Sequence, residues 1–193
     1  RVFRTRTPRT LSAHHEGSNW NHAWIGIVDN TESILTLDEW QSLLVLAVLD
    51  GNRWFSVFTS MSGGHLYRDA SSRASKARYN ADVLYRLSKV ASWFQPYSKS
   101  LQDSSPALID DVITDHTEGT VRIRKNKDTK EMWFAGISPP DGPHKNKSTQ
   151  LIELPYESGV VTNMATGSST PVSGGVYELP LTPVAEPYHF TPS

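Results

Sequence analysis

Apolar residues along the chain form two patterns that are typical of helices. The run from Trp40 to Leu49 is apolar on nearly all sides, which is typical of a central, buried helix. Thr36 and Glu39 stand three residues apart just before it, a spacing that predicts a capping box at the start of this helix. A second, longer helix is predicted from about residue 72 to 94, because apolar residues recur there at helical spacing until Pro96 prevents continuation.

Other segments have the composition or the alternation of strands. They are residues 23–28, 53–61, 120–124, 131–137 and, as a last short strand, 150–154. The third and fourth are expected to pair as a β-hairpin. Within this hairpin Val121 and Ile123 should face the core. Arg122 and Arg124, at the alternate positions, should project outward together.

The two ends of the chain differ from this central part. Residues 1–18 show no periodicity and are expected to form a basic arm. Residues 155–193 contain six prolines among Gly, Ser and Thr, which favours an extended tail without regular structure. Ser105-Pro106 should start a short helix that runs to Ile113. We therefore expect an α+β fold: a single compact domain at 19–154 with a small, mostly antiparallel sheet, two main helices, and extended N- and C-terminal arms.

Composition excludes several classes of protein. The 193 residues include no cysteine, so disulfides and thiolate metal sites are impossible. The longest apolar run, from Leu43 to Leu49, is too short to span a bilayer, and no signal peptide opens the chain. We therefore expect no contact with a membrane, and the sequence carries no signal for secretion. Because the chain begins with Arg1 rather than Met, we expect a fragment, a processed product or a trimmed record.

Charge is distributed unevenly along the chain although the net charge is only −1. Residues 1–10 carry four arginines and no acid, whereas residues 11–50 carry six acids and no Lys or Arg. Residues 151–193 carry four acids and no base. Such segregation is expected where different surfaces face different partners, because basic surfaces attract phosphate. It is equally expected where the segments neutralise one another after folding.

Candidate catalytic residues are few, because no phosphate loop, nucleophile elbow, zinc-protease or dinucleotide motif is present. His116 lies among carboxylates in the segment 115–118, which suits acid–base chemistry, but such a segment before Gly119 is far more often an ordinary polar turn. His65 follows two glycines and could approach a ligand or simply occupy a turn. The segment 14–16, His-His-Glu, could bind a metal, although adjacent side chains diverge in an extended backbone. We expect no cofactor and no metal.

Basic residues offer a stronger signal for nucleic-acid binding. The residues expected to contact phosphates, in the arm and on the hairpin, are Arg1, Arg4, Arg6, Arg9, Arg122, Arg124, Lys125, Lys127 and Lys130. The alternative for the hairpin is a solvated edge protected by charge. The alternative for the arm is a linker.

The leading functional hypothesis is a structural assembly subunit without enzymatic activity. Its layout of arm, core and tail is similar to that of many small viral coat or nucleocapsid proteins, and this similarity implies self-association and RNA binding without sequence specificity. It also implies a location in the virion or the host cytoplasm. Two alternatives remain open: a small hydrolase or transferase that uses His116 or His65 with nearby carboxylates, and a non-catalytic protein-interaction module.

Overall fold

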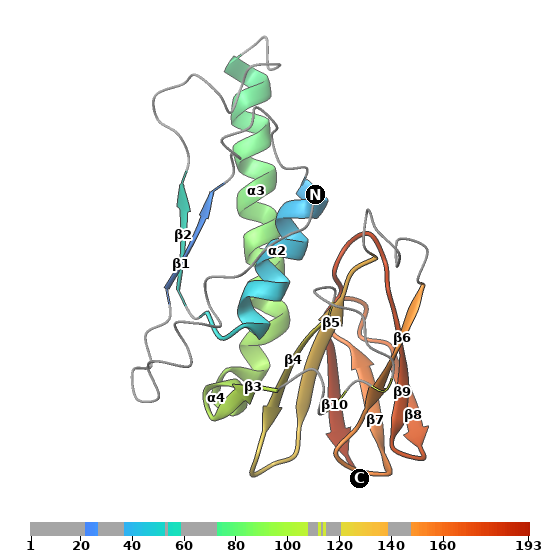
Figure 1. Cartoon of the computed structure of the whole chain (residues 1–193). Coiled ribbons are helices and arrows are strands. Elements are labelled where there is room, and N and C mark those ends of the chain that lie inside the picture. The colour runs from blue at the N-terminus through green and yellow to red at the C-terminus, as the bar shows by residue number, and fades with distance from the viewer. Residues whose placement is uncertain are drawn as a thin grey trace.

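The chain folds into an α+β structure with two main helices and a mostly antiparallel sheet, as the sequence predicts (Figure 1). The structure is a computed structural model. It describes residues 22–26, 37–52, 54–58, 73–107, 112, 114, 121–138 and 148–193. The predicted basic arm lies outside these residues, as does the predicted capping residue Thr36.

The first described part of the chain is a parallel β–α–β unit followed by a second helix. Strands β1 (His22–Gly26) and β2 (Trp54–Phe58) pair in parallel, with His22 opposite Trp54. Parallel neighbours need a crossover, and α2 (Leu37–Leu49) lies in that connection. Helix α3 (Arg73–Phe94) follows β2. Among the described residues, β1 and β2 pair with no strand other than each other.

The buried character predicted for α2 is confirmed. Trp40, Leu44 and Val45 are fully buried, and Gln41 and Ser42 are buried with them. The helix ends where Gly51 adopts a positive φ of 95°, a conformation that glycine reaches without a steric penalty.

Helix α3 ends before Pro96, as predicted, but the residues after it do not match the prediction. A 3-10 turn, η1 (Gln95–Tyr97), leads into the short helix α4 (Ser98–Gln102). Residues Ser104–Pro106 then form a strand, β3, rather than the start of a helix. β3 pairs with the strand that contains Arg124. Pro106 has no backbone N–H to donate, and β3 tolerates this because it is an edge strand and Pro106 is its last residue.

The main sheet has six strands in the order β3-β4-β5-β10-β7-β8. The predicted hairpin is confirmed, since β4 (Val121–Asn126) pairs antiparallel with β5 (Met132–Gly136). Its remaining strands are β7 (Ser158–Asn163), β8 (Ser169–Ser173) and β10 (Tyr188–Pro192). A second sheet consists of β6 (Thr149–Glu153) and β9 (Val176–Pro180), paired antiparallel.

The expectation that residues 155–193 form an extended tail without regular structure is wrong. They contain β7, β8, β9 and β10, and β10 lies inside the sheet between β5 and β7. The prolines are compatible with strands because of where they fall. Pro171 lies in the edge strand β8, and Pro180 and Pro192 are the last residues of their strands. At such positions a missing amide costs little.

The elements stack in layers, with the helices between the β1-β2 pair and one face of the six-stranded sheet (Figure 1). Alternate residues of β5 pack into two different hydrophobic cores. Trp133 and Ala135 pack with α2 and α3, whereas Met132 and Phe134 pack between the two sheets. At β4 and β5 the six-stranded sheet is therefore covered on both faces, whereas alternate residues at the start of β7 are exposed. Among the described residues, no helix is long and apolar enough to cross a membrane.

Candidate functional site

Arg122 and Arg124 point into the protein rather than outward, so the expected placement of these two side chains is wrong. Arg122 is 8% exposed and Arg124 is 5% exposed. The Arg122 Nε lies 2.9 Å from the Asp50 Oδ1, at the end of α2. Arg124 donates from Nε to the Ser104 Oγ at 2.8 Å and from a terminal nitrogen to the Leu49 carbonyl at 3.4 Å. Both cations attach the sheet to the end of α2.

The two-sided cover of the sheet explains this result. Val121 and Ile123 face the core between the sheets, as predicted. Strand alternation therefore turns Arg122 and Arg124 to the opposite face. A sheet with one solvated face would leave them in water, but here the helices occupy that face.

Three of the predicted hairpin cations remain accessible. Lys127 is exposed, and Lys125 and Lys130 are half-buried. They lie at the end of β4 and in the turn to β5, next to Asp128 and Glu131 in the chain. Their charge is therefore partly offset by neighbouring carboxylates, and of the five cations predicted to bind phosphate on the hairpin, three remain accessible.

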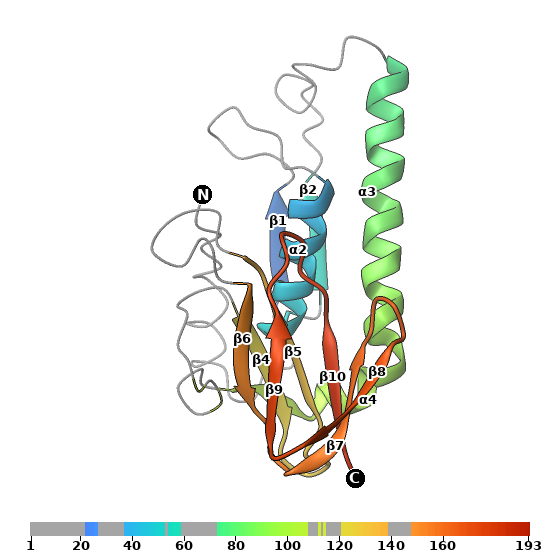
Figure 2. The same cartoon turned by 90° about the vertical axis from the view of Figure 1, so that its right-hand side faces the viewer.

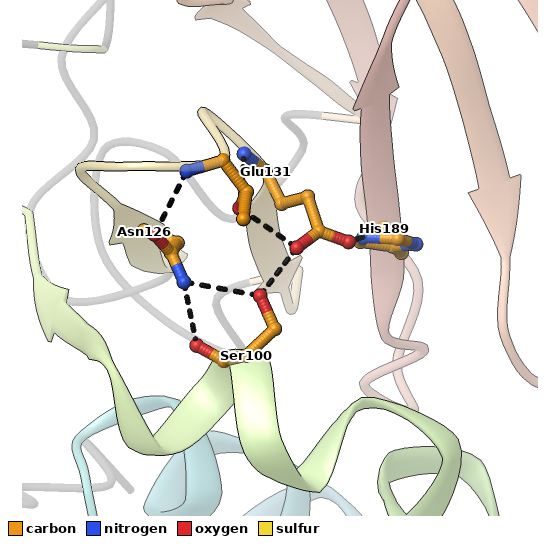
Figure 3. A network of polar contacts seen from close by, with 5 residues as sticks. Ser100, Asn126, Glu131 and His189 are labelled. Carbon is orange, nitrogen blue, oxygen red and sulfur yellow. Dashed lines mark hydrogen bonds and ion pairs between the residues drawn. The ribbon is translucent and has the colours of Figure 1, made fainter.

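A polar cluster centred on Glu131 joins three parts of the chain (Figure 3). One carboxylate oxygen of Glu131 accepts hydrogen bonds from the Ser100 hydroxyl in α4 and from the Thr129 hydroxyl, the latter at 2.8 Å. The other oxygen lies 3.0 Å from the His189 Nε2 in β10. Asn126 adds a hydrogen bond from its amide nitrogen to the Ser100 carbonyl at 3.0 Å. The cluster thus connects α4, the β4–β5 turn and β10.

His189 packs against two aromatic rings, of which one is stacked and the other tilted. It stacks on Trp133 with ring centroids 5.0 Å apart, and the Tyr97 ring lies 4.2 Å away on centroids. Burial lowers the pKa of His189, and the nearby Glu131 only partly opposes this. A neutral His189 then donates its Nε2 proton to the Glu131 carboxylate.

Glu131 remains ionised in this environment. Burial by itself would raise its pKa, but the hydrogen bonds from Ser100 and Thr129, together with His189, outweigh burial and lower the pKa. In a nucleophilic triad the histidine stands between the hydroxyl and the carboxylate. Here the carboxylate of Glu131 stands between Ser100 and His189, so His189 is not placed to take the Ser100 proton. The cluster fixes structure and does not activate a nucleophile.

A cavity of about 300 Å³ lies between α2, α3 and α4. Its walls are mainly apolar, and Leu44, Val48, Leu87, Val90, Phe94 and Leu101 contribute to them. Arg124 reaches its lining from β4. The volume is at the lower end of the range for small-molecule pockets.

The remaining predicted site residues lie outside the described residues. They are Arg1, Arg4, Arg6, Arg9, His65, His116 and the metal candidates at 14–16. Within the described part of the chain, no group of three or more His, Asp or Glu side chains could hold a metal ion.

Sequence reasoning missed His189, Glu131 and Ser100 as a cluster. His189 lies in the region that is predicted to be an extended tail, and its contact with Glu131 joins positions 58 residues apart in the chain. The aromatic triplet at 188–190 was the one local signal of a buried strand. Its composition is that of a strand, and the prolines around it concealed this.

No protein family model matches the chain, and no curated protein sequence matches it. Several solved structures share its fold. An Anoxybacillus α-amylase matches with a TM-score of 0.58 at 14% identity, over 96% of this chain and 41% of that one. A protein described as a glycoside hydrolase matches with a TM-score of 0.54 at 7% identity, over 90% of this chain and 41% of that one.

The α-amylase of Geobacillus thermoleovorans, solved with acarbose, matches with a TM-score of 0.52 at 11% identity, over 89% of this chain and 39% of that one. The chain therefore spans about two fifths of the length of these structures. At such identities the likeness shows a common fold.

Proposed function

We propose that this chain forms part of a carbohydrate-active protein of the glycoside hydrolase type, acting on the glycosidic bonds of oligo- or polysaccharides. The observation that carries the proposal is the order of its elements. A parallel β1–α2–β2–α3 array is followed directly by two packed antiparallel sheets. Solved glycoside hydrolases share this arrangement over about nine tenths of the chain or more.

The antiparallel part would act as a support for the βα array. Asp50 of α2 pairs with Arg122 of β4, and the Ala185 amide donates to the Ser42 hydroxyl of α2 at 2.8 Å. Buried charge pairs and hydrogen bonds of this kind are costly to break. They hold α2 in one position on the sheet, which a substrate site built on the same βα array would require.

In parallel βα arrays, ligands bind at the carboxyl ends of the strands. The segments that follow β1 and β2 in the sequence begin at residues 27 and 59. They lie outside the described residues, and the second contains His65. His116 instead lies between β3 and β4 in the chain, away from the βα array in the sequence. The proposal therefore favours His65 over His116 as a substrate-contacting residue.

The test is affinity electrophoresis of the purified chain in gels that contain soluble starch, xylan or carboxymethylcellulose, combined with measurement of the reducing ends released from each polysaccharide. Retardation in at least one polysaccharide gel is expected, and His65→Ala should reduce it. His116→Ala is the matched control and should migrate like the wild type. Migration unchanged by all three polysaccharides, together with no release of reducing ends, would contradict the proposal.

The second candidate is the self-associating assembly subunit, and one observation favours it. Leu84 and Tyr85, on α3, are 62% and 64% exposed, which is unusual for large apolar side chains that lie side by side. The C-terminal residues form strands within this chain's own sheets, so contacts between copies would use other surfaces. The RNA-binding arm proposed for such a subunit lies outside the described residues.

Light scattering and the ratio of absorbance at 260 and 280 nm test this second candidate. A large particle with bound nucleic acid is the expected result for a coat or nucleocapsid protein. A monomer that does not bind RNA at low salt would contradict it, because phosphate contacts by basic side chains are strongest there.

A further inference from the structure

The cavity between α2, α3 and α4 has an accessible mouth and a buried, apolar interior. Figure 2 shows α4 at the lower end of α3, where the mouth lies. The exposed residues of its lining are Ala91, Gln95, Ser98 and Gln102. The buried apolar residues of its lining are Leu44, Val90 and Phe94. A molecule that enters from solvent would therefore reach an apolar interior.

The volume of the cavity suits a small organic molecule. It is about 300 Å³. An apolar cavity of about 150 Å³ in a protein interior binds benzene, so twice that volume should hold a molecule of about ten non-hydrogen atoms. Atoms that line such a space lack contact partners while it is empty, and an apolar occupant would supply them.

Asn52 contributes a buried polar group to this lining. Its side chain is 5% exposed, and its amide nitrogen donates to the Ala47 carbonyl at 2.9 Å. A carbonyl only accepts, so this contact fixes which side of the amide carries the oxygen. Within the described residues, the Asn52 side-chain oxygen accepts no hydrogen bond, and it is not among the sealed polar atoms that lack a partner. It is therefore an acceptor open to the cavity, and buried acceptors normally have a donor.

Charge in the lining selects against ionic molecules. Among the described lining residues, Arg124 alone carries a charge, which would repel a cation. Its guanidinium already donates to the Ser104 hydroxyl, the Ser104 carbonyl and the Leu49 carbonyl. Arg124 thus helps to hold the cavity wall in place, and an anion is not required to satisfy it.

We propose that this cavity is a binding site for a small, uncharged and mainly apolar molecule with one hydroxyl group, such as a phenol. The hydroxyl donates to the Asn52 oxygen, and the apolar body packs among Leu44 and Phe94. Asn52 lies just before β2 begins at Trp54, whereas ligands of a βα array bind beyond the carboxyl ends of its strands. This inference therefore does not depend on the glycoside hydrolase proposal.

Equilibrium dialysis of the whole chain against 2-naphthol and against naphthalene tests the chemistry of the site. Saturable binding of 2-naphthol is expected at neutral pH, at least about fivefold tighter than that of naphthalene, because naphthalene leaves the Asn52 oxygen without a donor. A purely apolar space would prefer naphthalene, since burying an unpaired hydroxyl is costly. Naphthalene that binds as tightly as 2-naphthol would therefore overturn the proposal, as would no saturable binding of either probe.

Two alanines of α3 provide a matched pair of variants that tests the location. Ala91 is exposed and lines the mouth, so the large side chain of Ala91→Trp should take up the space and weaken 2-naphthol binding at least about tenfold. Ala81 is exposed on the same helix but does not line the cavity, so Ala81→Trp should bind like the wild type. Both positions are exposed, and circular dichroism checks that both variants fold. Equal binding by the two variants would overturn the proposed site.

Discussion

The buried ion pair between Asp50 and Arg122 gives the most direct test of how the sheet is joined to α2. The two charged atoms are 2.9 Å apart, and the side chains are 2% and 10% exposed. We consider the substitution Asp50→Asn, which keeps the shape of the side chain and removes its charge. Arg122 would then be a buried cation whose carboxylate partner in α2 has become neutral.

The expected loss is large because little water reaches this cation. Removing one partner of a buried pair costs about 3–5 kcal/mol in the free energy of unfolding. For a chain of this size each kcal/mol corresponds to about 2–4 °C, so the melting temperature should fall by about 10 °C. The double variant Asp50→Asn with Arg122→Gln should lose less than the sum of the two single losses.

Urea unfolding followed by tryptophan fluorescence is a suitable assay, because Trp40 and Trp133 are fully buried and will report exposure of the core. Glu178→Gln, the same chemical change at an exposed carboxylate on β9, is the control. It should alter stability by less than about 0.5 kcal/mol. If Asp50→Asn loses no more stability than Glu178→Gln, the sheet and α2 are not held together by this pair.

Three further predictions concern the interior. A methyl group on Gly159 would collide with the ring of Phe190 and with the backbone of β10. Gly159→Ala should therefore lower the free energy of unfolding, measured in urea, by about 1–3 kcal/mol. Unchanged stability would show that β7 and β10 are not so close. The pKa of His189 is lowered from 6.5 and that of Glu131 from 4.5, so the unfolded state binds these protons before the folded state does. Stability should therefore fall as the pH drops below about 6.5, and fall further below 4.5. Melting temperatures between pH 8 and pH 4 check this, and His189→Gln should flatten the upper part of the decline. Burial raises the pKa of Tyr188 to about 12 from 10.0, so stability should also fall as the pH rises above 10, where the unfolded tyrosine ionises first; a spectrophotometric titration in which every tyrosine ionises near 10 would contradict this.

Local physics in the sequence determined the two main helices and the β4–β5 hairpin. The all-round apolar run after Thr36 has no stable place other than a buried helix, and a glycine ends it. Pro96 terminates α3 because its ring cannot continue a helix. The alternation at 120–124 specified a strand and its two faces. Each of these signals lies within a few residues of the element that it specifies.

The Glu131 cluster could not be predicted in the same way. Ser100 and His189 are 89 residues apart in the chain, and only the insertion of β10 beside β5 brings both to Glu131. No periodicity in the sequence records such a pairing, because strand order in a sheet depends on contacts between distant segments.

Tertiary structure alone decided which surfaces face water. The sequence by itself determined that Arg122 and Arg124 lie on the face opposite Val121, since successive strand residues alternate. Whether that opposite face is solvated depends on what packs against it, and here α2 covers it and supplies Asp50 as a partner. Residues 155–193 follow the same logic. Their prolines disfavour regular structure locally. Whether a proline is tolerated in a strand depends on its place in the sheet, and here the prolines fall at strand ends or in the edge strand β8.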